Sequence, residues 1–271
     1  VKDASRAVGV CQKLITDSTR ESYVAEIAAE HERRREQHAG KPSRAARVTL
    51  GEARAQRLQL DWASYQPPVP KLPGIRVLDD IPLGELVPFV DWMPFFNAWE
   101  FTGTYPALLD DPKRGAAARS LFDDAQQLLT RLLRDRSLRA RAVVGLFPAN
   151  SAGDDIEIYA DDSRRQVAWR LPQLRQQKAP TPGQPQRSLA DFLAPRESGK
   201  ADWFGAFAVT AGHGIDVLLA EYAAAHDDYG ALLLQALADR LAEAAAEWLH
   251  LRVRREWWGY APDESYSNDE L

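Results

Sequence analysis

The chain has 271 residues, which is long for one domain and short for two, and its 45% hydrophobic and 27% charged side chains are typical of a globular protein. Its net charge of −5 argues against nucleic acid as a partner, and its single cysteine excludes an internal disulfide framework and a cysteine-rich zinc site. No apolar run approaches the roughly 18 residues of a membrane span. The first residues lack a signal peptide, so we expect a cytoplasmic protein.

The first predicted element is helical and covers residues 5–38, with a second segment that follows Asp17-Ser18. Its far end, residues 31–38, is almost wholly polar, which is typical of an exposed helix or of a connector between domains. Gly40 is a plausible C-cap and residues 41–44 read as a linker, so we place a boundary near residue 40.

The segment 41–110 is rich in proline and aromatic residues. Within it, Trp92, Phe95, Phe96 and Trp99 have the i, i+3, i+4, i+7 spacing of a helix face. We interpret these four side chains as part of the core.

An amphipathic helix is predicted over residues 113–136, followed by a change of period. Residues 142–147 form a short apolar run that we expect to end at Pro148 as a buried strand, and residues 155–170 have the pattern of an antiparallel hairpin. The remaining predicted elements are a loop at 178–187, a strand at 203–209 and helices at 214–225 and 228–256. This order favours an α+β fold with a mostly antiparallel sheet.

Several short motifs could suggest chemistry but favour structural roles. Gly212-His213-Gly214 is half of a dinucleotide fingerprint without a βαβ unit, so we interpret it as a turn. His226-Asp227-Asp228 could hold a metal, but an aspartate here is well placed to cap the next helix. Cys11 lies on an apolar helix face, which predicts a small buried side chain and not a nucleophile.

The role of two sets of acidic residues remains open: three carboxylates on one helix and the single carboxylate of Asp91. Asp239, Glu243 and Glu247 share one helix face, and the simplest interpretation is a solvated stripe. Asp91 stands in a strongly apolar segment, where a carboxylate has to be hydrogen-bonded, paired or at a ligand site. Composition and spacing do not choose among these alternatives.

Long stretches resemble the C-terminal part of cobalamin-dependent methionine synthase. DWxPFF at 91–96 and ADRLAEA at 238–244 resemble its reactivation domain, and residues 1–10 resemble the end of its cobalamin-binding domain. Further similar stretches are 144–150, 153–159, 198–202, 205–209, 226–229 and 258–262. The resemblance implies a curved domain with a twisted antiparallel sheet and flanking helices, preceded by a helical connector. It divides the chain into the end of the cobalamin domain (1–16), a linker (17–40) and a reactivation domain (41–271).

The resemblance also implies a function. In this family the reactivation domain binds S-adenosyl-L-methionine, whose methyl group regenerates methylcobalamin from oxidised cofactor after a flavodoxin-type donor supplies an electron. The enzyme is a methyltransferase that makes methionine. The implied cofactors are therefore S-adenosylmethionine and cobalamin, the latter held mainly by the cobalamin-binding domain of the same polypeptide. Arg131, Arg134, Arg136, Arg139 and Arg141 are a candidate docking patch for an acidic flavoprotein, with a solvated surface as the simpler alternative.

By the same resemblance, Asp91 matches an aspartate that contacts the ligand's amino group, and Glu243 matches a glutamate near its sulfonium. The family's arginine-containing ligand segment would follow Leu271, and its cobalt-ligating histidine would precede Val1. A capping-box pattern at Ser267–Glu270 also predicts a helix that continues beyond the chain. We therefore expect about half a binding site here and no activity of the isolated chain. The alternative is a docking fragment that keeps the fold without binding the ligand.

Overall fold

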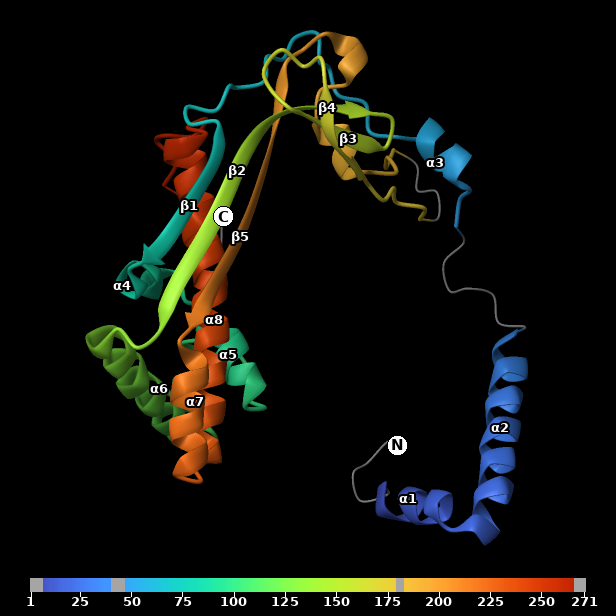
Figure 1. The fold of residues 1–271 in the computed structure, drawn as a ribbon, viewed down its shortest axis with the longest axis vertical. Helices are drawn as coiled ribbons and strands as arrows, with labels where there is room; N and C mark the ends of the chain where they lie inside the picture. The colour runs from blue at the N-terminus through green and yellow to red at the C-terminus, as the bar shows by residue number, and fades with distance from the viewer. Residues whose placement is uncertain (1–6, 40–46, 179–182, 266–271) are drawn as a thin grey trace. The chain divides into compact units, whose positions relative to one another are not determined.

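The computed structural model describes residues 7–39, 47–178 and 183–265, and within them it contains eight α-helices and an open antiparallel sheet of five strands (Figure 1). This confirms the predicted α+β class. Residues 1–6, Gly40, the 41–44 linker and the capping box at Ser267–Glu270 lie outside the described residues. Among the helices that are described, none combines the length and the apolar character that crossing a membrane requires.

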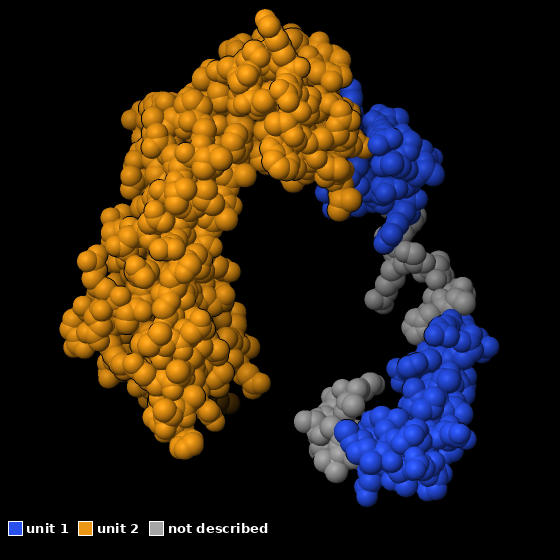
Figure 2. Space-filling view, in the orientation of Figure 1, with its two compact units in different colours: residues 1–58, 175–187 blue, residues 59–174, 188–271 orange. Residues whose placement is uncertain are grey.

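The chain forms two compact units, one of residues 1–58 with 175–187 and the other of residues 59–174 with 188–271 (Figure 2). The domain boundaries at residues 16 and 40 stay predictions. The first unit contains α1 (Ala7–Ile15), α2 (Asp17–Ala39) and α3 (Leu50–Ala55). The predicted division into two helical segments is confirmed, although α2 already includes Asp17 and Ser18, after which the second segment was expected.

One expectation about the first unit is wrong. Cys11 is exposed in α1 instead of buried. Leu14 and Ile15 of the same helix are also 40% and 75% exposed, so this nine-residue helix is not buried against a core in the described structure. The apolar face that the sequence shows is real, but a helix face is buried only where another element covers it.

The second unit is built around one long strand, β2 (Arg139–Ala152). β1 (Gly74–Ile81) and β5 (Asp202–His213) pair with β2 on its two sides, and β3 (Asp155–Tyr159) pairs with its far end and with β4 (Val167–Pro172). All of these pairings are antiparallel. The predicted hairpin at 155–170 is thus confirmed as β3 and β4.

The prediction that the strand ends at Pro148 is wrong, because β2 continues for four residues beyond it. Pairing with β1 reaches Leu146, and pairing with β3 begins at Ala149. The proline therefore falls where one neighbour has ended and the next has not begun, while β5 continues opposite it at Trp203. A residue without an N–H is tolerated in a strand where a ladder is interrupted.

The helices of the second unit are α4 (Leu83–Leu86), α5 (Trp92–Ala98), α6 (Gly115–Asp135), α7 (Ile215–Ala224) and α8 (Asp228–Arg252). They confirm the predicted helices at 113–136, 214–225 and 228–256, the last of which ends in a π-helical turn at Val253–Trp257. α8 packs on β5, and it also contacts α5 and α7 (Figure 1). Val144 and Leu146 of β2 join Leu237 and Leu241 of α8 in the main core.

β3 adds Ile156 and Ile158 to a second, smaller core, and between these two residues it carries a buried ion-pair cluster. Glu157 is only 1% exposed in its side chain, and its two carboxylate oxygens accept from Arg170 at 2.5 Å and Arg196 at 3.0 Å. The two guanidiniums are more than half exposed. The cluster joins β3 and β4 to the segment after residue 195, because arginines from both places pair with this one buried carboxylate.

Glu157→Gln should lower the free energy of unfolding by about 1–3 kcal/mol, because it removes the charge that both arginines contact and leaves an imperfectly paired buried group. Urea unfolding followed by tryptophan fluorescence measures this loss. Glu197→Gln is the matched control, since Glu197 is exposed and lies 3.8 Å from the same Arg196. We expect the control to change stability by less than about 0.5 kcal/mol, and equal losses in the two variants would contradict the role given to Glu157.

Candidate ligand-binding site

The candidate site lies where the segment 83–99 runs along α8. At one end of this segment the Glu85 carboxylate accepts from Trp248 Nε1 at 3.2 Å, and at the other end the ring of Trp99 lies 5.3 Å from that of Tyr229. Both α4 and α5 contact α8 between these points (Figure 1). The segment therefore runs antiparallel to α8, and residues between Glu85 and Trp99 lie alongside the middle turns of that helix.

Asp91 is at the start of α5, within this segment. It is the N-cap of the helix, and its Oδ1 accepts from the Met93 backbone N–H at 2.9 Å. This agrees with the hydrogen-bonded alternative of the sequence analysis and leaves the ligand role a prediction. The side chain is exposed, because it projects from the helix end while Phe95 and Phe96 enter the core one turn later. Among the residues that the structure describes, Asp91 makes no other hydrogen bond or ion pair.

The aromatic stripe beside Asp91 is confirmed as core. Phe95 and Phe96 are 1% and 0% exposed, and Trp92 and Trp99 are partly buried against the same core. Trp92 contacts Phe95 and Phe122 edge-on, at centroid distances of 5.6 and 4.9 Å. This packing fixes α5, and with it the position of the Asp91 carboxylate.

On α8, Asp239 and Glu243 are exposed, as predicted for a solvated stripe, and Glu247 is half-buried. What the sequence did not predict is the residue between them. Arg240 is 9% exposed, and its guanidinium donates to Asp239 at 2.5 Å and to Glu243 at 3.0 Å. The stripe is thus a cluster of two carboxylates held by one buried cation on the middle turns of α8.

The other short motifs have the structural roles expected of them. Gly214 has a φ of +99° and begins α7 after the end of β5, which confirms the turn. Asp227 caps α8 by accepting from the Gly230 N–H at 2.8 Å. Within the described residues, no group of three or more His, Cys, Asp or Glu side chains could hold a metal ion.

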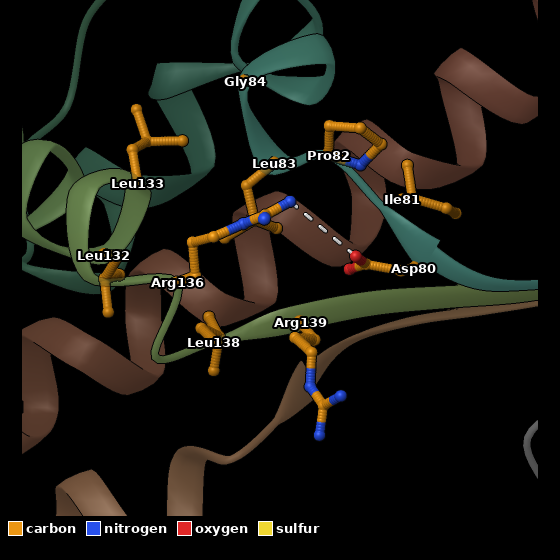
Figure 3. A pocket seen from close by; sticks show the side chains of 10 residues that line it. All are labelled: Asp80, Ile81, Pro82, Leu83, Gly84, Leu132, Leu133, Arg136, Leu138 and Arg139. Atoms are coloured by element: carbon orange, nitrogen blue, oxygen red, sulfur yellow. Dashed lines mark ion pairs between the residues drawn. The ribbon is translucent and has the colours of Figure 1, made fainter.

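The candidate basic patch is largely paired with acids. Arg131 contacts Asp135 and Glu221, and Arg134 also pairs with Asp135. Arg136 reaches Asp80 at 3.8 Å across a hollow of about 450 Å³ whose floor is apolar, and Arg139 points away from that pair (Figure 3). These pairs lower the net positive charge that an acidic partner would meet.

A larger concavity, of about 590 Å³, was not predicted from the sequence. Two edge-on ring pairs line it, Trp62 with Tyr65 and Trp258 with Tyr260. Trp258 Nε1 donates to the Pro68 carbonyl at 2.9 Å, which joins segments 190 residues apart. The many aromatic residues before residue 110 indicated that this segment is packed. They did not indicate that it packs against the residues that follow α8.

Comparison with known proteins assigns the family. Residues 82–271 match the family described as vitamin B12 dependent methionine synthase, activation domain. The fold is similar to a crystal structure of the MetH reactivation domain bound to AdoHcy, with a TM-score of 0.79 and 48% sequence identity over 83% of this chain and 68% of that one.

The chain thus has the fold of a reactivation domain. This fold is an α+β unit in which a long helix packs on one open antiparallel sheet. The chain belongs to the family of activation domains of vitamin B12-dependent methionine synthases. The carboxylates Asp91 and Glu243, predicted as site residues by resemblance, stay predictions.

Tyr229, at the start of α8, gives a test of how this helix is anchored. Burial and a 2.7 Å hydrogen bond to Asp124 of α6 raise the pKa of Tyr229 to about 12. Between about pH 10, where an unfolded tyrosine ionises, and pH 12 the unfolded chain binds fewer protons than the folded chain. The stability present below pH 10 is therefore lost as pH rises through this window.

We expect Asp124→Asn to keep the contact but lower the pKa of Tyr229, because it removes the negative charge that opposes tyrosinate. Tyr229→Phe should remove one high-pKa tyrosine from the titration. Ultraviolet absorbance of tyrosinate against pH measures both effects. A titration unchanged in both variants would contradict the assignment.

Proposed function

We propose that this domain binds S-adenosylmethionine and supports the reductive methylation that regenerates methylcobalamin in a methionine synthase. The observation that carries the proposal is the pair of exposed carboxylates, Asp91 and Glu243, on elements that pack together in a domain 48% identical to one bound to AdoHcy. S-adenosylmethionine carries an ammonium and a sulfonium, so carboxylates are the side chains suited to both of its cationic groups.

In the proposed site, the Asp91 carboxylate accepts a hydrogen bond from the ligand's ammonium. Its Oδ1 already accepts from the Met93 N–H, so Oδ2 is the oxygen available to the ligand. Glu243 lies near the sulfonium and stabilises its positive charge through space, since a sulfonium donates no N–H or O–H hydrogen bond. Neither residue acts as a general base, because the methyl group leaves sulfur without loss of a proton. The domain thus works by holding the methyl group in position.

When bound, cobalamin supplies the nucleophile that accepts this methyl group. By the resemblance, we propose that another domain of the same polypeptide holds the cobalt. A flavodoxin-type protein as the electron donor remains a proposal from the resemblance, and a cytoplasmic location also remains a proposal. The acid pairing of Arg131, Arg134 and Arg136 gives the donor's docking patch no added support.

A second candidate function is docking without ligand binding, which the resemblance leaves open. Isothermal titration of the full-length protein with S-adenosylmethionine separates the two. Saturable binding supports the ligand-binding role, whereas no heat of binding at millimolar ligand, with the fold intact by circular dichroism, supports the docking role.

Asp91→Asn should weaken S-adenosylmethionine binding by about 1–3 kcal/mol, because it removes the charge of the carboxylate that pairs with the ammonium. Asparagine caps helices as well as aspartate does, so the α5 N-cap and the fold should be kept. Calorimetric dissociation constants of the full-length variant and wild type measure the loss.

Asp227→Asn is the matched control, since Asp227 is also an aspartate N-cap in the same unit but belongs to the start of α8. We expect its ligand affinity to stay within about twofold of wild type. An unchanged affinity in Asp91→Asn, or equal losses in both variants, would remove Asp91 from the site.

A further inference from the structure

Arg240 has an environment that differs from that of the two acids it contacts. Its side chain is 10% exposed, whereas the side chains of Asp239 and Glu243 are 70% and 67% exposed. The guanidinium emerges from beneath the acids, with Nη2 donating to Asp239 and Nη1 to Glu243. Arg240 is thus a largely buried cation, and the two carboxylates are its exposed partners.

The charge of this arginine is secured by the same contacts. Burial by itself lowers the pKa of Arg240, but the hydrogen bond to Asp239 and the charge of Glu243 outweigh burial and raise the pKa. Arg240 is therefore a permanent cation, and the three side chains together carry one net negative charge. An arginine can serve two carboxylates at once because its planar group has N–H donors on separate nitrogens.

An exposed glutamate on a helix has several rotamers, and only some of them point its charge toward any given place. The 3.0 Å hydrogen bond from Arg240 selects among these for Glu243. It uses Oε2, and within the described part of the chain Oε1 makes no hydrogen bond, so Oε1 can face a ligand while Oε2 is held.

We propose that Arg240 is a positioning residue of the ligand site, which holds the Glu243 carboxylate so that the domain distinguishes a sulfonium from a neutral thioether. This inference rests on the proposed function. It adds that discrimination between S-adenosylmethionine and S-adenosylhomocysteine depends on a residue that touches neither ligand.

Two physical effects of Arg240 predict opposite results. If Arg240 positions Glu243, its removal lets the carboxylate move away and the preference for the cationic ligand falls. If Arg240 only neutralises the acids, its removal makes the site more negative and the preference for the cation rises. If Arg240 only supports α8, both ligands weaken equally. The ratio of the two dissociation constants, for S-adenosylhomocysteine over S-adenosylmethionine, therefore separates the three cases.

The experiment is calorimetric titration of the full-length protein with each ligand. We expect Arg240→Gln to lower the ratio about 3- to 10-fold, the scale of the net contribution of one typical hydrogen bond. Arg240→Lys should give an intermediate ratio, because one ammonium can hold only one carboxylate well. This second variant keeps the charge and gives a reading even if Arg240→Gln folds poorly. In a Glu243→Gln background, Arg240→Gln should change the ratio by less than about twofold, because the carboxylate that Arg240 positions is no longer present.

Arg252→Gln is the matched control. Arg252 lies about 18 Å further along α8, at 1.5 Å per residue, and also contacts two glutamates, Glu85 and Glu256. Its ratio should equal that of wild type. A ratio that rises or stays unchanged in Arg240→Gln overturns the positioning role, even if wild type binds both ligands. Failure of wild type to bind either ligand overturns the proposed function itself, and with it this role.

Discussion

The architecture of the larger unit depends on the burial of one face of α8. Leu234, Leu237, Leu241 and Leu249 are at most 1% exposed, and they belong to the same core as the buried residues of β2. Burying four leucines contributes about 6–12 kcal/mol relative to leaving them in water, as an upper estimate. A whole domain has a net stability of only about 5–15 kcal/mol. The α8 contact is therefore indispensable to the fold.

This burial also determines what the opposite face of the helix presents. With a fixed period of 3.6 residues, packing Leu237 and Leu241 inward leaves Asp239 and Glu243 on the outside. Arg240 falls at the border between the two faces, where its long stem is covered and its guanidinium can still reach the acids. The segment 83–99 is held against α8 by the contacts of Glu85 and Trp99, and it carries Asp91 with it. The packing of α8 in the core therefore also determines which side chains lie at the candidate site.

The parts of the fold that were predictable from sequence are those decided locally. The amphipathic pattern of α6, the hairpin of β3 and β4 and the cap at Asp227 each depend on residues close in sequence. The prediction that the strand ends at Pro148 failed because a strand can contain proline where its neighbours leave a gap. Here pairing with β1 stops before Pro148 and pairing with β3 starts after it, which only the sheet shows. Cys11 misled because burial of a helix face requires a covering element.

The candidate site shows the same division. Resemblance named Asp91 and Glu243, and spacing placed Glu243 with Asp239, but neither indicated that Arg240 lies beneath both acids. The reason is that an arginine next to acids in sequence is common on exposed helices, where such pairs contribute little. Only the packing of α8 against the rest of the unit distinguishes a buried cation from a solvated one.

In the proposed site, this charge arrangement has a consequence for turnover. Loss of the methyl group converts a sulfonium into a neutral thioether, while the ligand's ammonium and carboxylate stay the same. Asp91 therefore binds substrate and product alike, and it contributes affinity without discrimination. Glu243 interacts favourably with the substrate's sulfonium and loses that interaction once the methyl group has left. A carboxylate held in place by Arg240 would thus favour binding of the sulfonium ligand before methyl transfer and release of the thioether afterwards. A carboxylate that turned freely into solvent would interact weakly with both ligands and would not distinguish them.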